Sequence, residues 1–140
     1  GALYNMAATD AALAMDIVHV LNTVTPGAKL VGPPRSALED AALASGVGFI
    51  AEGFADRAYE ASGQLRSRSM EGAVLTGREA QVKRARELAL QQQVTTFDGS
   101  ALALRIDTIC VHGDTANAVE AAIAIRSSLE VHGVTICAVN

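Results

Sequence analysis

Apolar residues recur every three or four positions in several stretches of the chain, which is the spacing of one face of a helix. The first stretch predicts a helix over residues 10–24, with Thr9 as its N-cap and Thr25-Pro26-Gly27 as its stop. Its inward face consists of Leu13, Ile17, Leu21 and Val24. A second helix is predicted from Ser36 to about residue 45, because Ser36 and Glu39 have the spacing of a capping box.

Two further helices follow the same pattern. Thr76 and Glu79 again have capping-box spacing, and they open a predicted helix over residues 76–92. The basic residues expected on its outward face are Arg78, Lys83, Arg84 and Arg86. Thr115 is the expected N-cap of the last helix, which ends at Gly133. Its expected inward residues are Val119, Ile123 and Leu129.

Short apolar runs without two-residue alternation separate these helices, and such runs are typical of parallel strands covered on both faces. Strands are expected at residues 29–31, 47–51, 73–75, 108–112 and 134–139. Residues 94–97 and 101–105 flank the turn Phe97-Asp98-Gly99-Ser100 and predict a hairpin. The alternation of strand and helix predicts a single α/β domain over residues 1–140.

The composition narrows the function classes. The formal charge is −4, with 11 Lys+Arg against 15 Asp+Glu, and the chain has two Tyr, three Phe and no Trp, which disfavours a dedicated nucleic-acid binder. No apolar run approaches the ~18–20 residues of a membrane span. Cys110 and Cys137 lie in apolar runs without His partners at zinc-ligand spacing, so we expect reduced thiols, a cytoplasmic protein and no zinc site at these two cysteines.

Ionisable residues gather directly after two predicted strands, where α/β proteins place their chemistry. Glu52 could be a general acid or base, or hold a cation, and it could equally be a structural carboxylate. Asp56 and Arg57 could clamp a ligand or form a salt bridge that holds the long irregular segment 53–72.

The other group lies at the end of the predicted strand at residues 108–112. His112 could transfer protons or ligate a metal, or it could merely order the turn at Gly113. Asp114 could share in that chemistry or act only as a helix cap. In the irregular segment, Arg66 and Arg68 could bind an anion or belong to a solvated loop. The sequence contains no Walker, G-x-G-x-x-G or G-x-S-x-G motif.

Four motifs in order along the whole chain resemble the LamB/YcsF family. They are Gly1-Ala2-Leu3-Tyr4-Asn5, Ala51-Glu52-Gly53-Phe54-Ala55-Asp56-Arg57-Ala58-Tyr59, Arg66-Ser67-Arg68 with Gly72-Ala73-Val74, and Asp107-Thr108-Ile109-Cys110-Val111-His112-Gly113-Asp114-Thr115. Family members extend further at the N-terminus. The resemblance therefore implies a C-terminal portion, that is, an incomplete irregular β/α barrel of the glycoside hydrolase/deacetylase type.

The resemblance also implies the activity of bacterial ATP-dependent 5-oxoprolinase. That enzyme opens 5-oxoproline to L-glutamate with ATP as co-substrate, and this family forms its A subunit beside subunits B and C. In this setting His112 and Asp114 are expected to manage protons, and Glu52 and Asp56 to position substrate or a cation. The residues expected to bind substrate or anion are Arg57, Tyr59, Arg66 and Arg68.

Two other functions stay open at this stage. A metal-dependent hydrolase or deacetylase of the same barrel group would also use Asp and His side chains at strand ends. Alternatively, the chain could be an inactive fragment whose role is to dock to partner subunits. An incomplete barrel leaves strand edges unpaired, so the isolated chain is expected to form homo-oligomers or to aggregate.

Overall fold

The structure, a computed structural model, describes residues 2–114 and 117–138 and comprises two compact units, Gly1–Glu52 and Gly53–Asn140. The first unit holds α1 (Ala2–Ala7), α2 (Ala11–Val24), β1 (Leu30–Gly32) and α3 (Ala37–Ala44). It also holds the start of β2 (Phe49–Phe54), which crosses the boundary at residue 52. Among the described residues, no helix is long and apolar enough to cross a membrane.

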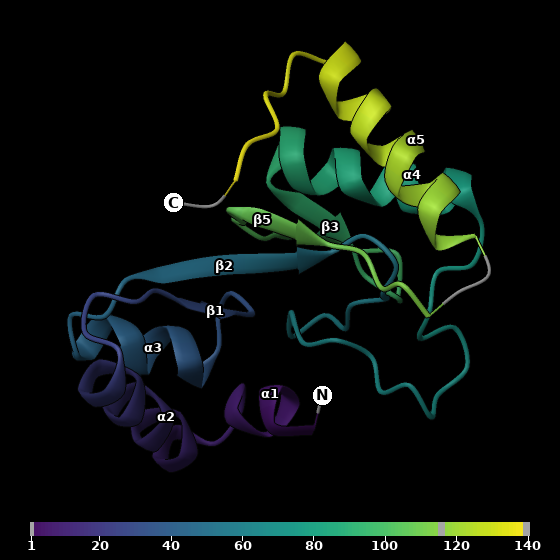
Figure 1. Cartoon of the computed structure of the whole chain (residues 1–140). Helices are drawn as coiled ribbons and strands as arrows, with labels where there is room; N and C mark the ends of the chain where they lie inside the picture. Colours follow the sequence, from purple (N-terminus) through teal and green to yellow (C-terminus); the bar gives the residue numbers. More distant parts are fainter. Residues whose placement is uncertain (1, 115–116, 139–140) are drawn as a thin grey trace. The chain divides into compact units, whose positions relative to one another are not determined.

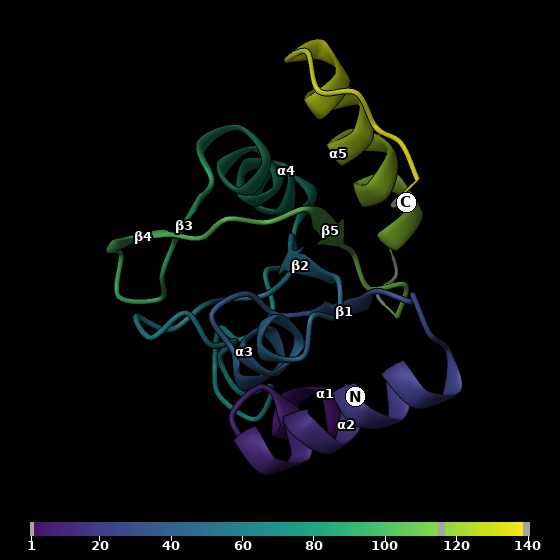
Figure 2. The same cartoon turned by 90° about the vertical axis from the view of Figure 1, so that its left-hand side faces the viewer.

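The first unit is a parallel strand pair with helices packed beside it. β1 pairs with β2 in parallel, so that Val31 lies opposite Ile50. α2 and α3 lie side by side (Figures 1 and 2). The small side chains of their facing surfaces let the helices approach closely. The buried residues of this core are Ala7, Ala14, Val18, Leu38, Ala41, Ala42 and Val47.

Of the two N-caps predicted for this unit, one is confirmed and the other is wrong. Ser36 caps α3 as predicted, because its hydroxyl accepts a hydrogen bond from the Glu39 amide at 3.3 Å. The prediction of Thr9 as the cap of α2 is wrong. Asp10 takes that position, and its carboxylate accepts from the amides of Ala12 and Leu13 at 3.0 Å each. Thr9 instead donates to the Met6 carbonyl.

This difference gives a matched test of stability. Replacing Asp10 by Ala should lower the free energy of unfolding by about 1 kcal/mol, because two amides at the start of α2 lose their acceptor. Thr9→Ala should change it by less than about 0.5 kcal/mol, as an exposed substitution outside the cap does. Urea unfolding of both variants measures the two effects. Equal losses would show that Asp10 has no special capping role.

The second unit contains two packed helices, a hairpin and a further strand. Its elements after β2 are α4 (Arg78–Arg86), the π-helical turn η1 (Glu87–Gln91), β3 (Gln93–Thr95), β4 (Ala101–Ala103), β5 (Thr108–Cys110) and α5 (Ala118–Val131). α4 and α5 lie side by side (Figures 1 and 2). They share a small core formed by Ala55, Ala85, Ile125 and Leu129. The predicted hairpin is confirmed, since β3 and β4 pair antiparallel.

Several predicted features of the second unit are wrong. α4 begins after Gly77, whose φ is 98°, and the Thr76–Glu79 capping box does not form. Residues 73–75 form only one isolated bridge, between Val74 and Arg57, and residues 134–138 form no strand. The expected cap Thr115 lies outside the described residues.

The inward face of α5 also differs from the prediction. Ala121, Ile125 and Leu129 are buried, whereas Val119 and Ile123 are 71% and 61% exposed. Helical spacing allows either face, and packing against α4 selects the one that includes the small Ala121. Taken together, the two units confirm a mixed α/β structure with a parallel strand pair.

Candidate active site

Two of the sequence-predicted residues meet in the second unit, each two residues beyond the end of a strand. Asp56 follows β2 and His112 follows β5. The amide of Ala55 donates to the carbonyl of Cys110 at 3.1 Å and joins the two segments just before these residues. Backbone pairing therefore brings a carboxylate and an imidazole together although they are far apart in sequence.

The contact between them is close and doubly anchored. The His112 amide donates to Oδ2 of Asp56 at 3.0 Å, and its ring Nδ1 lies 3.0 Å from Oδ1 and 2.9 Å from Oδ2. The Asp56 side chain is 3% exposed, whereas that of His112 is 28% exposed. A carboxylate accepts hydrogen bonds, so Nδ1 carries the proton toward Asp56 and Nε2 is the nitrogen with a free lone pair in the neutral ring.

Aromatic rings hold this pair in position. The ring of Phe54 stacks on the His112 ring, with centroids 5.7 Å apart and planes 18° apart. The Phe54 amide in turn donates to the hydroxyl oxygen of Tyr59 at 2.8 Å. Tyr59 is 2% exposed, so this predicted substrate-binding residue lies inside the unit and supports the strand end that carries Phe54.

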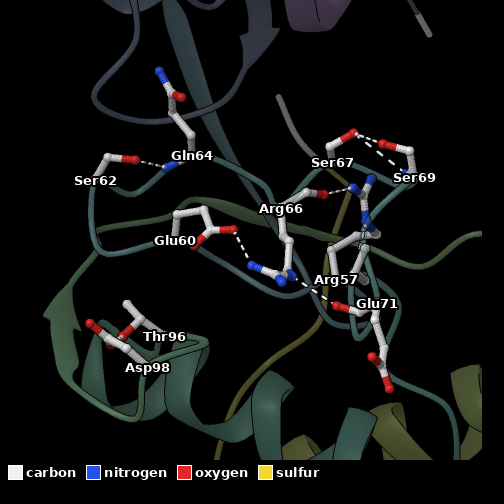
Figure 3. Close-up of polar contacts among 11 residues, drawn as sticks. Arg57, Glu60, Ser62, Gln64, Arg66, Ser67, Ser69, Glu71, Thr96 and Asp98 are labelled. Atoms are coloured by element: carbon white, nitrogen blue, oxygen red, sulfur yellow. Dashed lines mark hydrogen bonds and ion pairs between the residues drawn. The ribbon is translucent and has the colours of Figure 1, made fainter.

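Arg57 is also directed inward. Its Nε donates to the carbonyl of Ala73 at 3.2 Å, and its Nη2 donates to the carbonyl of Arg66 at 2.6 Å (Figure 3). The residue is 6% exposed. Burial lowers the pKa of its guanidinium, and the nearby charge of Arg68 lowers it further. These bonds tie Arg66, inside the irregular segment, and Ala73, just after it, to the residue that follows Asp56.

Arg66 folds the same segment onto the hairpin. Its Nη1 forms an ion pair with Glu60 at 2.7 Å, and its Nε donates to the carbonyl of Glu71 at 2.8 Å (Figure 3). Its guanidinium also lies 3.6 Å from the centroid of the Phe97 ring, at the tip of the β3–β4 hairpin. These contacts use much of the Arg66 head group within the protein itself.

Arg68 and Asp114 form the second pair of predicted residues that the structure brings together. Arg68 Nη1 lies 3.3 Å from Asp114 Oδ2, and the two side chains are 51% and 61% exposed. The pair connects the irregular segment to the residues after His112. Glu52, by contrast, belongs to the first unit, where the Tyr4 hydroxyl donates to its Oε2 at 3.0 Å.

Arg84 is a structural residue that sequence reasoning placed on the wrong face of α4. Its side chain is 9% exposed, and its Nη1 and Nη2 donate to the carbonyls of Arg57 and Thr95 at 3.3 and 2.6 Å. Nε lies 3.3 Å from Oε2 of Glu87, and burial lowers the pKa of the guanidinium. The available signal is its four-residue spacing from the buried Leu88, since residues four apart lie on the same face of a helix.

The described residues contain no group of three or more His, Cys, Asp or Glu side chains arranged to hold a metal ion. Cys110 and Cys137 are not joined in a disulfide. The arrangement can instead hold one imidazole in a fixed orientation, with a buried carboxylate behind it and an exposed guanidinium on the neighbouring segment. This is a geometry for accepting and returning a proton beside an anionic ligand.

Comparison with known proteins adds independent information. The sequence model of the LamB/YcsF family matches residues 1–140. The A subunit of 5-oxoprolinase from Symbiobacterium thermophilum is 43% identical over 97% of this chain and 52% of that protein. The corresponding A subunit from Thermus thermophilus is 41% identical over 97% of this chain and 54% of that protein.

A solved structure agrees with these relatives. The crystal structure of the lactam utilization protein from Thermus thermophilus is similar to this chain with a TM-score of 0.88 at 39% identity. The match covers 97% of this chain and 54% of that one. The chain thus spans about half the length of the curated relatives it matches.

Proposed function

Because this chain belongs to the LamB/YcsF family, we propose that it acts in the ATP-driven opening of 5-oxo-L-proline to L-glutamate, as part of the A subunit of a 5-oxoprolinase. The observation that carries this proposal is the Asp56–His112 pair, which supplies an oriented base at the ends of two strands. The names of the relatives and of the solved structure, which refer to 5-oxoprolinase and lactam utilization, support the substrate class.

The chemistry of the lactam explains why such a base is needed. A lactam is a resonance-stabilised amide, and water attacks it poorly at neutral pH. Transfer of the γ-phosphoryl group of ATP to the lactam oxygen releases ADP and makes the ring carbon electrophilic. Water then adds to that carbon, and the ring C–N bond breaks as the nitrogen takes a proton, which leaves an acyl phosphate. A second water hydrolyses the acyl phosphate to L-glutamate and phosphate.

In the proposed mechanism, His112 activates the water. Nε2 accepts the proton of the attacking water and returns it to the departing ring nitrogen. Asp56 accepts the hydrogen bond from Nδ1, holds the ring in the required tautomer and stabilises the imidazolium that forms. Arg57 and Tyr59 act as structural supports of this pair, because their polar groups bond within the protein.

The finer architecture belongs to the same proposal. The two units would form part of an irregular β/α barrel, completed by the additional length found in the relatives. The relatives are named as one lettered component of 5-oxoprolinase, which supports assembly with further components, and we propose these to be subunits B and C. The role of Glu52 in positioning substrate or a cation stays a prediction.

The test is glutamate release from 5-oxoproline in the presence of ATP and subunits B and C. It compares this chain with a completed chain, in which it is joined to the remaining length of the Symbiobacterium thermophilum relative. We expect turnover with the completed chain. If the completed chain shows no turnover although the same subunits B and C are active with a native A subunit, the proposal is contradicted. Turnover without ATP that is lost on chelation would instead identify a metal-dependent hydrolase.

A further inference from the structure

We propose that Arg68 binds the carboxylate of the substrate and that Asp114 occupies this binding position until the substrate carboxylate displaces it. The ligand class is a small carboxylic acid, here the lactam acid of the proposed reaction, so the inference rests on the proposed function. The observation that supports it is the exposed contact between Arg68 and Asp114, since Asp114 lies on the segment that carries His112.

The first line of support is the difference among the three arginines of the irregular segment. Arg57 donates to two backbone carbonyls, and Arg66 is held by Glu60, a carbonyl and the Phe97 ring. Arg68 is half-exposed, and within the described residues its one ion pair is the contact with Asp114. A guanidinium carries several N–H donors in a planar fork, so most donors of Arg68 are not used by the residues that the structure describes.

The second line of support is the local charge. Arg68 lies close enough to Arg57 to lower the pKa of the Arg57 guanidinium, second only to the effect of burial. Neighbouring cations repel each other, and an anion bound at Arg68 would offset that repulsion. The carboxylate of Asp114 already provides part of this compensation, at 3.3 Å from Arg68.

The third line of support is the weakness of the existing contact. Water screens an ion pair whose side chains are 51% and 61% exposed, so the Arg68–Asp114 pair contributes little to stability. A ligand carboxylate that takes both prongs of the guanidinium fork forms a stronger, bidentate contact. A ligand carboxylate can therefore take the place of the Asp114 carboxylate at Arg68.

The position of the exchange links it to the reaction. Asp114 is two residues after His112, so a carboxylate that replaces it lies beside the segment that holds the proposed base. Arg68 would then fix the orientation of the lactam ring relative to His112. This makes Arg68 a substrate-binding residue and Asp114 a competitor for the same guanidinium.

The experiment measures KM and kcat for 5-oxoproline in the completed chain assembled with subunits B and C. Arg68→Gln should raise KM by about 10- to 100-fold, as loss of a charged hydrogen-bond pair does, while kcat changes little. The KM of Arg68→Lys should lie between that of the unmodified chain and that of Arg68→Gln, because lysine keeps the positive charge but lacks the planar fork of N–H donors. Asp114→Asn should lower KM by about two- to fivefold, since it removes the competing carboxylate.

Arg86→Gln is the matched control, because Arg86 is an exposed arginine on α4 outside the site. Opposite shifts of KM in Arg68→Gln and Asp114→Asn would support the exchange, whereas a purely structural ion pair would shift both variants in the same direction. If the variants turn over and the KM of Arg68→Gln equals that of Arg86→Gln, the inference is overturned, whereas the proposed function is left intact.

A separate binding measurement distinguishes the two proposals if no glutamate is released. Titration of the completed chain with acetate, followed by NMR, reports on a carboxylate site without any turnover. Weaker acetate binding in Arg68→Gln and tighter binding in Asp114→Asn, relative to Arg86→Gln, would support the carboxylate exchange while the proposed reaction fails. Equal acetate binding in all three variants would overturn the exchange.

Discussion

Replacing His112 by Gln in the completed chain is expected to lower kcat for glutamate release by about 10²- to 10⁴-fold, the usual contribution of a positioned general base. Glutamine can form hydrogen bonds, but it cannot accept a proton at neutral pH. The 28% exposed ring of His112 tolerates this change because the buried member of the pair is Asp56. Steady-state glutamate release at saturating ATP and 5-oxoproline measures the effect.

The matched control is His19→Gln, because His19 is an exposed histidine on α2. Its kcat should equal that of the unmodified protein. Circular dichroism and thermal unfolding of both variants should show that they fold. If folded His112→Gln keeps the unmodified kcat, His112 is not the base of the reaction.

Replacing Asp56 by Asn should lower kcat by about 10²-fold or more, although the side-chain shape is retained. The carboxylate accepts hydrogen bonds from both the amide and the ring Nδ1 of His112. An amide in the same place can present an N–H to Nδ1, which favours the opposite tautomer and leaves Nε2 protonated. His112 then cannot accept the proton of water at Nε2.

The double variant tests whether the two residues act as one unit. Because Asp56 acts through His112, Asp56→Asn combined with His112→Gln should be no slower than His112→Gln alone. Asp16→Asn, at an exposed carboxylate on α2, is the control and should leave kcat unchanged. If the losses in kcat of the two single variants multiply in the double variant, Asp56 contributes separately and its role is not to position His112.

The elements predicted most accurately depend on local signals. The cap at Ser36 and the hairpin around Phe97-Asp98-Gly99-Ser100 form as expected, because side-chain capping and turn conformation involve residues close in sequence. The strands β1, β2 and β5 also lie within about three residues of the predicted runs. The predicted cap Thr9 is wrong by one residue, because Thr and Asp are both favourable caps and only the structure shows that Asp10 takes the position.

The helices α4 and α5 show that the local sequence pattern is insufficient to predict which side chains are buried. Arg84 has the sequence character of an exposed residue, yet it is buried because the carbonyls of Arg57 and Thr95 and the carboxylate of Glu87 surround it. On α5, Ile123 is exposed although it is strongly apolar. Both outcomes depend on partners distant in sequence, which periodicity does not contain.

The same distinction applies to the candidate site. The sequence by itself determined which ionisable residues are candidates for chemistry and that Asp56 and His112 lie at the ends of strands, because residue type and apolar runs are local properties. Only the tertiary structure decided which side chains meet. It pairs Asp56 with His112, turns Arg57 and Tyr59 inward and leaves Arg68 exposed beside Asp114. The physical reason is that long-range backbone pairing and the satisfaction of buried polar groups, rather than residue spacing, direct each side chain.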